Sequence, residues 1–204
     1  MHTREHWETI WRTHPPTGVS WYAPHLAESL RLIREVTGPD AAVIDIGGGA
    51  STLVDDLIVH GYTRVTVLDI SAAALAIARA RLGERAALVE WIEADITATT
   101  MPGAAYDVWH DRAVFHFLTS QVDRDAYVRA LEYSLRPGGW LVIGTFAPAG
   151  PEQCSGLEVV RYDASGLQRA LGMHFLLSAA AEQTHLTPDG RQQHFTVCRL
   201  QRVA

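Results

Sequence analysis

Cysteine, positive charge and long apolar runs are all scarce in this sequence. Its two cysteines, Cys154 and Cys198, cannot build a disulfide framework, which favours a reducing setting. Its 17 Lys and Arg face 23 Asp and Glu, whereas nucleic-acid-binding proteins usually carry a basic stripe. No apolar run approaches the roughly 20 residues that cross a membrane, and the N-terminus is too polar for a signal peptide. We therefore expect a cytoplasmic protein that binds neither nucleic acid nor membranes.

Motifs for metals and for phosphate are missing as well. The ten histidines are scattered, and the two cysteines are far from C-x-x-C spacing, so we expect no metal site. The sequence also lacks the G-K-[S/T] of a phosphate-binding P-loop. Any nucleotide-like ligand must therefore be held in another way.

Segments with the pattern of strands alternate with helical segments over most of the chain. This alternation predicts a doubly wound α/β fold, with a mostly parallel sheet covered by helices on both faces. Near the end, two strands joined by a turn at 187–190 should form an antiparallel hairpin. The seven predicted strands cover 41–46, 65–69, 87–94, 108–110, 140–146, 175–177 and 194–200.

The length of 204 residues suits a single domain. Within it, we expect residues 1–39 to form a helical lid, because Trp7, Ile10 and Trp11 share one face of a short helix. Residues 41–146 should form the ligand-binding core. Residues 147–204 should supply a loop beside the reaction site and the hairpin.

The sequence Val-Ile-Asp-Ile-Gly-Gly-Gly-Ala-Ser-Thr at residues 43–52 is the most informative stretch. It predicts a strand, a glycine turn and the start of a helix, which together bring backbone N–H groups and a positive helix end to a ligand. The glycines let the main chain approach that ligand closely. Thr52 stands where a dinucleotide-binding turn has its third glycine, and Asp45 would repel a pyrophosphate. An acid at this position suits a ligand with an ammonium group instead.

These residues resemble those of the class I S-adenosylmethionine-dependent methyltransferases, which have a Rossmann-like, seven-stranded fold. Their first motif, an acid, any residue and then Gly-x-Gly, matches residues 45–49. Asp69 resembles the acid that holds both ribose hydroxyls, and Asp95 the acid that meets the adenine amine. Residues 106–112 and 135–139 resemble the fourth-strand motif and the turn before the fifth strand. Read alone, Asp69 and Asp95 could equally be helix caps.

The resemblance implies S-adenosylmethionine as the cofactor. Trp7, Trp11 and Trp21 resemble the N-terminal aromatic residues of thiopurine S-methyltransferases, which close over the cofactor, and an indole face suits a sulfonium or an adenine. Trp7 and Trp11 could instead only pack on the sheet. The predicted cofactor contacts are Trp11, Trp21, Asp45, Gly47, Gly48, Gly49, Asp69, Ile70, Asp95, Ile96 and His110.

Residues 109–113, Trp-His-Asp-Arg-Ala, carry the information on the methyl acceptor. They resemble the Trp-Asp-Arg-Gly stretch of thiopurine S-methyltransferases and the Asp-Lys-Gly stretch of some elongation-factor lysine methyltransferases. They depart from both, because Ala113 replaces the glycine and His110 precedes the acid. The predicted acceptor is a small molecule, with a thiol or another soft nucleophile favoured.

Several residues are candidates for the chemistry of transfer. A neutral amine or hydroxyl needs a base, and Asp111, His110 and His116 are the candidates, with Arg112 in a supporting role. We expect Tyr22, Arg112 and Cys154 to contact the acceptor, although Arg112 could instead pair with Asp111. Cys198 should lie in the core.

Other functions remain open at this stage. A protein lysine methyltransferase would need an open groove lined with carboxylates, whereas an apolar pocket favours a small molecule. A nucleoside-binding protein without catalysis is a second alternative, and a nicotinamide oxidoreductase is disfavoured by Thr52. The sequence is equally compatible with a monomer and a homodimer.

Overall fold

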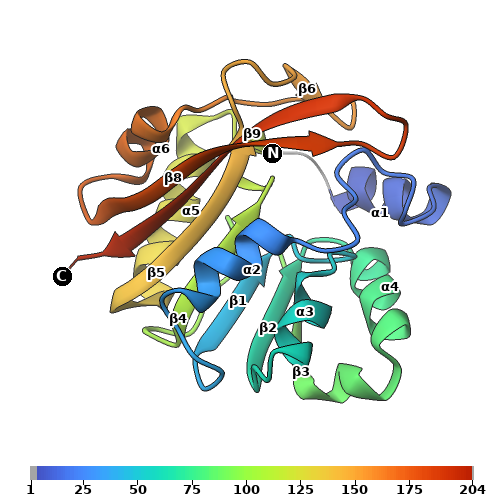
Figure 1. Cartoon of the computed structure of the whole chain (residues 1–204), viewed down its shortest axis with the longest axis horizontal. Coiled ribbons are helices and arrows are strands. Elements are labelled where there is room, and N and C mark those ends of the chain that lie inside the picture. Colours follow the sequence, from blue (N-terminus) through green and yellow to red (C-terminus); the bar gives the residue numbers. More distant parts are fainter. Residues whose placement is uncertain (1–3, 204) are drawn as a thin grey trace.

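Helices and strands alternate along most of the chain in the computed structural model, which describes residues 4–203 (Figure 1). The helices are α1 (Arg4–Thr13), α2 (Ala27–Arg34), α3 (Leu53–Val59), α4 (Ala72–Leu82), α5 (Gln121–Ser134) and α6 (Ala164–Leu171), with 3-10 turns at Gly83–Leu88 and Phe115–Phe117. The strands are β1 (Ala42–Ile46), β2 (Arg64–Asp69), β3 (Val89–Glu93), β4 (Tyr106–Arg112), β5 (Leu135–Phe146), β6 (Gln153–Cys154), β7 (Leu157–Glu158), β8 (Phe175–Leu186) and β9 (Gln192–Arg202).

Seven of these strands form one sheet in the order β3-β2-β1-β4-β5-β9-β8. The first five run parallel, while β9 pairs antiparallel with β5 and β8 pairs antiparallel with β9. The predicted mostly parallel sheet with a C-terminal hairpin is therefore confirmed. The chain crosses from one side of β1 to the other between β3 and β4, and such a switch point is where ligands bind in open α/β sheets.

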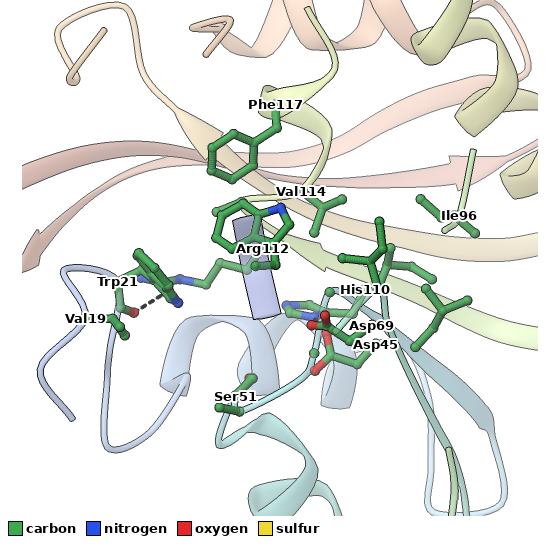
Figure 2. A pocket seen from close by; sticks show the side chains of 18 of the residues that line it. Val19, Trp21, Asp45, Ser51, Asp69, Ile96, His110, Arg112, Val114 and Phe117 are labelled. Atoms are coloured by element: carbon green, nitrogen blue, oxygen red, sulfur yellow. Dashed lines mark hydrogen bonds and ion pairs between the residues drawn. The ribbon is translucent and has the colours of Figure 1, made fainter. Parts of the chain in front are cut away.

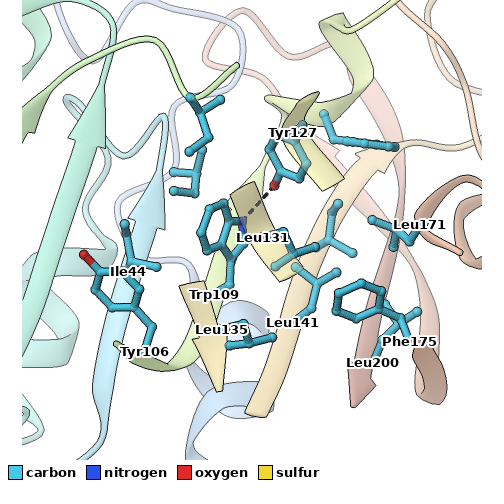
Figure 3. Packing of buried hydrophobic residues seen from close by; sticks show 14 of the residues in the cluster. Ile44, Tyr106, Trp109, Tyr127, Leu131, Leu135, Leu141, Leu171, Phe175 and Leu200 are labelled. Carbon is cyan, nitrogen blue, oxygen red and sulfur yellow. Dashed lines mark hydrogen bonds between the residues drawn. The ribbon is translucent and has the colours of Figure 1, made fainter. Parts of the chain in front are cut away.

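Apolar side chains fill both sides of the sheet. One cluster packs β4 and β5 against α5 and α6, with Trp109, Tyr127 and Leu171 fully buried (Figure 3). The other cluster packs the opposite face against α2, α3 and α4, through residues such as Ile33 and Leu57. All five residues of β1 are buried: Ala42, Ile44 and Ile46 enter one cluster, Val43 enters the other, and Asp45 faces the cavity described below. This explains why the central strands are nearly continuous apolar runs.

The ends of several elements differ from the prediction. Leu135 already pairs with Tyr106, so the predicted turn at residues 136–139 is an irregular bulge within β5, with Gly138 at φ 77°. β8 is much longer than predicted. Most of its side chains are exposed at the edge of the sheet, so its sequence has little of the hydrophobic pattern from which strands are predicted. The loop at 150–157 contains the short β6–β7 hairpin, with Ser155 and Gly156 both at positive φ.

Within residues 4–203, no helix has the length and apolar character required to cross a membrane.

Candidate functional site

A cavity opens at the carboxyl ends of β1, β2 and β4 and is covered by the N-terminal segment (Figure 2). The sheet supplies one wall, and α1 with the loop that follows it supplies the other. The predicted site residues that line this cavity are Trp11, Trp21, Tyr22, Asp45, Gly47, Gly48, Asp69, Ile70, Asp95, Ile96, His110, Arg112 and Cys154.

The glycine turn after β1 is closely packed on every side. Gly47 has φ 64°, and a Cβ there would lie 2.1 Å from Cγ2 of Val114. A Cβ on Gly48 would lie 2.5 Å from the carboxylate of Asp45, and one on Gly49 would lie 2.4 Å from that of Asp69. Gly49 itself does not line the cavity but allows Asp69 to lie against the turn. All three positions therefore need glycine for close approach.

Asp45 and His110 form a buried pair at the centre of the cavity floor. Nδ1 of His110 lies 2.6 Å from Oδ1 of Asp45, and its Nε2 lies 2.9 Å from the hydroxyl of Ser29. Both side chains are almost completely buried. Oδ2 of Asp45 has no hydrogen-bond partner in the described chain. A ligand with a positive charge fits beside this carboxylate, because a buried anionic oxygen without a partner is costly.

Asp69, which ends β2, and Asp95, which follows β3, line the same cavity. Oδ1 of Asp69, at the end of β2, accepts a hydrogen bond of 2.8 Å from the Ser71 amide. Burial raises the pKa of Asp69 to about 7. Oδ1 of Asp95 accepts from the amide and hydroxyl of Thr97 at 2.9 and 2.7 Å. Each acid therefore stabilises a local turn as well as lining the cavity, so the capping and ligand-binding roles are compatible.

Aromatic side chains form the cover of the cavity. Trp21 meets Trp7 and Trp11 edge to face, with ring centroids 6.1 and 5.8 Å apart, and Trp7 lies 5.1 Å from Phe117. Oε1 of Glu8 accepts hydrogen bonds from the Ser71 hydroxyl at 2.9 Å and the Ala73 amide at 3.1 Å. Glu8 thus fastens α1 to the first turn of α4, beside Asp69.

Arg112 and Cys154 lie at the end of the cavity toward β6 and β9. Arg112 donates a hydrogen bond of 2.9 Å to the carbonyl of Trp21, and its guanidinium lies 4.8 Å from the ring centroid of Phe195. Burial lowers the pKa of Arg112 to about 10, so it stays charged at neutral pH. Burial raises the pKa of the Cys154 thiol to about 12, which leaves it protonated and unreactive.

Asp111 and His116 do not reach the cavity. Asp111 points to the opposite face of β4, where its carboxylate accepts hydrogen bonds from the Val114 and Phe115 amides and from Tyr127, at 2.9, 3.1 and 2.6 Å. Burial raises the pKa of Asp111 to about 6. Burial, with a smaller effect of Arg112, lowers the pKa of His116 to about 3. These positions support the fold and give neither residue access to an acceptor, and Arg112 does not pair with Asp111.

Sequence reasoning missed several residues of the cavity. Val114 and Phe117 follow β4 and line it, and Ser29 anchors His110 from α2. Ser29 carries a signal, because it is a polar residue on the otherwise apolar, buried face of a short helix. Strand alternation through β4 could also have placed Asp111 opposite His110 and Arg112. In residues 4–203, no three His, Cys, Asp or Glu side chains gather in a way that could hold a metal ion.

Comparison with known sequences finds a methyltransferase domain and several methyltransferases among the relatives of this chain. A model described as a methyltransferase domain matches residues 43–139. EEF1A lysine methyltransferase 2 of Mus musculus is 30% identical over 82 residues, which cover 36% of this chain and 34% of that protein. The ubiquinone/menaquinone biosynthesis C-methyltransferase UbiE of Hahella chejuensis is 27% identical over 139 residues, or 64% of this chain and 53% of that protein. The chain thus spans between a third and about half of the length of these relatives.

Solved structures share the whole fold. A structure from work on the conversion of a disulfide bond into a thioacetal group during echinomycin biosynthesis has a TM-score of 0.79 at 21% identity, over 99% of this chain and 93% of that one. A methyltransferase from Anabaena variabilis has a TM-score of 0.77 at 16% identity, over 99% and 96% of the two chains. The finer resemblance to thiopurine S-methyltransferases stays a prediction from residues 109–113. The chain thus contains a methyltransferase domain at residues 43–139 and has the fold of class I S-adenosylmethionine-dependent methyltransferases, and the cofactor that this family and its neighbours support is S-adenosylmethionine.

Proposed function

We propose that this protein transfers a methyl group from S-adenosylmethionine to a small molecule, with a thiol or another soft nucleophile as the acceptor. One observation carries the proposal: one aromatic-covered cavity brings together the three acids Asp45, Asp69 and Asp95, but none of the candidate bases within residues 4–203 is free at its other end. The three acids match the polar groups of S-adenosylmethionine. Because no candidate base is free, the acceptor must be one that loses its proton unaided.

The proposed cofactor contacts follow from the chemistry of each group. The ribose hydroxyls would donate to Asp69 and the adenine amine to Asp95, while the ammonium of the methionine end would lie beside Asp45. The isoleucines after the two acids, Ile70 and Ile96, offer apolar contact to the adenine. Trp11 and Trp21 would cover the cofactor from above. When bound, S-adenosylmethionine supplies a methyl group on a sulfonium, which is already activated for displacement.

The protein residues then have two tasks, which are to align the acceptor and to exclude water. The cover of Trp7, Trp11 and Trp21 serves the second task. In the described part of the chain, none of the candidates His110, Cys154 and Asp111 is placed to remove a proton from an acceptor. His110 uses both ring nitrogens, Cys154 stays protonated, and Asp111 lies behind the wall. An acceptor that ionises unaided near neutral pH, such as a thiol, fits this arrangement better than an amine or an alcohol.

A protein lysine methyltransferase is the second candidate, and the match to EEF1A lysine methyltransferase 2 favours it. Two features of the cavity argue against it. The cover of tryptophans restricts access by a polypeptide, and the positive charge of Arg112 repels a lysine ammonium. Both features favour a small acceptor.

The test is turnover of methyl-labelled S-adenosylmethionine with a panel of thiols, selenols, amines and peptides. We expect label on thiols or selenols. Label confined to peptide or protein lysines would support the second candidate instead. If neither the panel nor a cell lysate ever takes label while S-adenosylhomocysteine binds, the protein is a nucleoside-binding protein without catalysis.

A further inference from the structure

The guanidinium of Arg112 lines the cavity without an acidic partner. None of the ion pairs found within residues 4–203 includes it. Its contacts are the neutral carbonyl of Trp21, at 2.9 Å, and the ring of Phe195, at 4.8 Å from the centroid. A guanidinium has five N–H donors, so most of them are available to a ligand. A partly buried charge of this kind requires compensation by an anion.

The position of Arg112 separates it from the three acids that are the proposed cofactor contacts. Asp45 and Asp69 lie at the ends of β1 and β2, and Asp95 follows β3; these are neighbouring strands on one side of the switch point. Arg112 ends β4, and its guanidinium lies over the ring of Phe195 on β9 and near Cys154 on β6; the charge of Asp45 also acts on it, but the two form no ion pair. Figure 2 shows its side chain reaching toward Trp21, while Asp45 and Asp69 lie across the cavity. The charge therefore faces the region that the cofactor leaves for the acceptor.

The rest of this region is aromatic. Trp7, Trp11, Trp21 and Phe117 present edges and faces to the cavity, and such surfaces favour flat, apolar molecules. Building on the proposed function, we propose that the acceptor is an aromatic molecule with an anionic group, a carboxylate or another oxyanion, and that Arg112 binds this group. The planar fork of the guanidinium matches two carboxylate oxygens at once. Arg112 thereby fixes the orientation of the acceptor and selects against cationic molecules.

A pair of matched probes tests this assignment. 2-Naphthoate and 2-naphthamide have the same ring system but differ in charge, and their binding to the protein saturated with S-adenosylhomocysteine is followed by tryptophan fluorescence and calorimetry. We expect naphthoate to bind about tenfold more tightly than naphthamide, the effect of one charge-assisted interaction. Arg112→Met should abolish this preference and Arg112→Lys should keep part of it. Arg34→Met, which changes an exposed arginine on α2, should leave it intact.

The methionine end of the cofactor also has a carboxylate. A second experiment distinguishes binding of this carboxylate by Arg112 from binding of the anionic group of the acceptor. S-Adenosylhomocysteine has this carboxylate, whereas 5′-methylthioadenosine lacks the whole amino-acid portion. If Arg112→Met weakens S-adenosylhomocysteine about tenfold and leaves methylthioadenosine unchanged, Arg112 binds the cofactor and the proposal is overturned. Equal affinity of the two naphthalene probes, or no binding of either at millimolar concentration, overturns it as well. Failure of the wild-type protein to bind S-adenosylhomocysteine would instead refute the proposed function.

Discussion

Asp69 is the residue whose ionisation we expect to control cofactor binding. Its carboxyl group has a pKa raised to about 7, first by burial and then by the nearby charges of Asp45 and Glu8. Ribose hydroxyls donate to the ionised form, so binding should release a proton from this group. The affinity for S-adenosylhomocysteine should therefore rise with pH, by about tenfold between pH 6 and pH 8, and then level off. Calorimetric titrations across this range measure the effect, and Asp69→Asn should bind weakly with a flatter profile.

The same carboxyl group should lower the stability of the protein without ligand at higher pH. Its pKa is higher in the folded chain than in the unfolded chain, so protonation favours the folded state. Its ionisation therefore decreases the free energy of unfolding as the pH rises from about 4 to about 7. We expect Asp69→Asn to melt at a higher temperature than the wild type at pH 8, and the difference to vanish near pH 4. If the wild type melts at a higher temperature than Asp69→Asn at pH 8, this explanation is contradicted.

Gly47 tests the packing of the glycine turn. Gly47→Ala places a Cβ 2.1 Å from Val114 at a positive φ, so both strain and overpacking oppose it. We expect a loss of about 2–4 kcal/mol in the free energy of unfolding, together with loss of cofactor binding. Gly83→Ala is the matched control, because Gly83 also has a positive φ but nothing lies within 4 Å of the added Cβ. Denaturant unfolding of both variants separates strain from crowding, and equal losses would show that crowding is unimportant.

At the level of elements, α1 covers the cavity through few contacts. It has no buried residues, and Glu8 supplies its hydrogen bonds to the first turn of α4. Glu8→Ala should therefore loosen α1, with roughly fivefold faster amide exchange over residues 4–13, the effect of about 1 kcal/mol. Dissociation of S-adenosylhomocysteine should also accelerate. Hydrogen exchange and stopped-flow measurements test this, and Glu5→Ala, an exposed change on the same helix, should have neither effect.

The elements that the sequence predicts well are those with a local cause. β1 and β2 are nearly continuous apolar runs because both of their faces are buried, and Ser71 predicts the start of α4 because its hydroxyl accepts from the Ala74 amide. β8 has no such pattern, because an edge strand with exposed side chains needs only its partner β9. Its length depends on pairing across the sheet, which local sequence does not encode.

The site residues also fall into those that local sequence predicts and those that depend on tertiary packing. Asp45 and Asp69 lie at the ends of their strands, and Asp95 follows shortly after β3, so local pattern was enough to place all three at one edge of the sheet. The sequence predicts Asp111 and His116 as candidate bases and a fourth strand that ends near His110. β4 continues to Arg112, so its alternation turns Asp111 to the opposite face. The lack of a carboxylate beside Arg112 depends on tertiary packing and could not be predicted.

For the whole molecule, the sheet, the C-terminal hairpin and the N-terminal segment together form the cavity. The sheet places the glycine turn and three acids along one edge, and the antiparallel hairpin brings Phe195 to the far end of that edge, beside Arg112. The N-terminal segment covers this cavity with Trp11 and Trp21, whose rings meet edge to face. The proposed cofactor and acceptor regions are thus parts of one cavity, as direct methyl transfer requires.

The central claim is that this cavity holds S-adenosylmethionine through its three acids. Calorimetric titration of the wild-type protein with S-adenosylhomocysteine and, separately, with NAD tests it most directly. We predict saturable binding of S-adenosylhomocysteine at one site per chain, much weaker binding to Asp69→Asn, and little or no binding of NAD. Tighter binding of NAD than of S-adenosylhomocysteine would contradict the account.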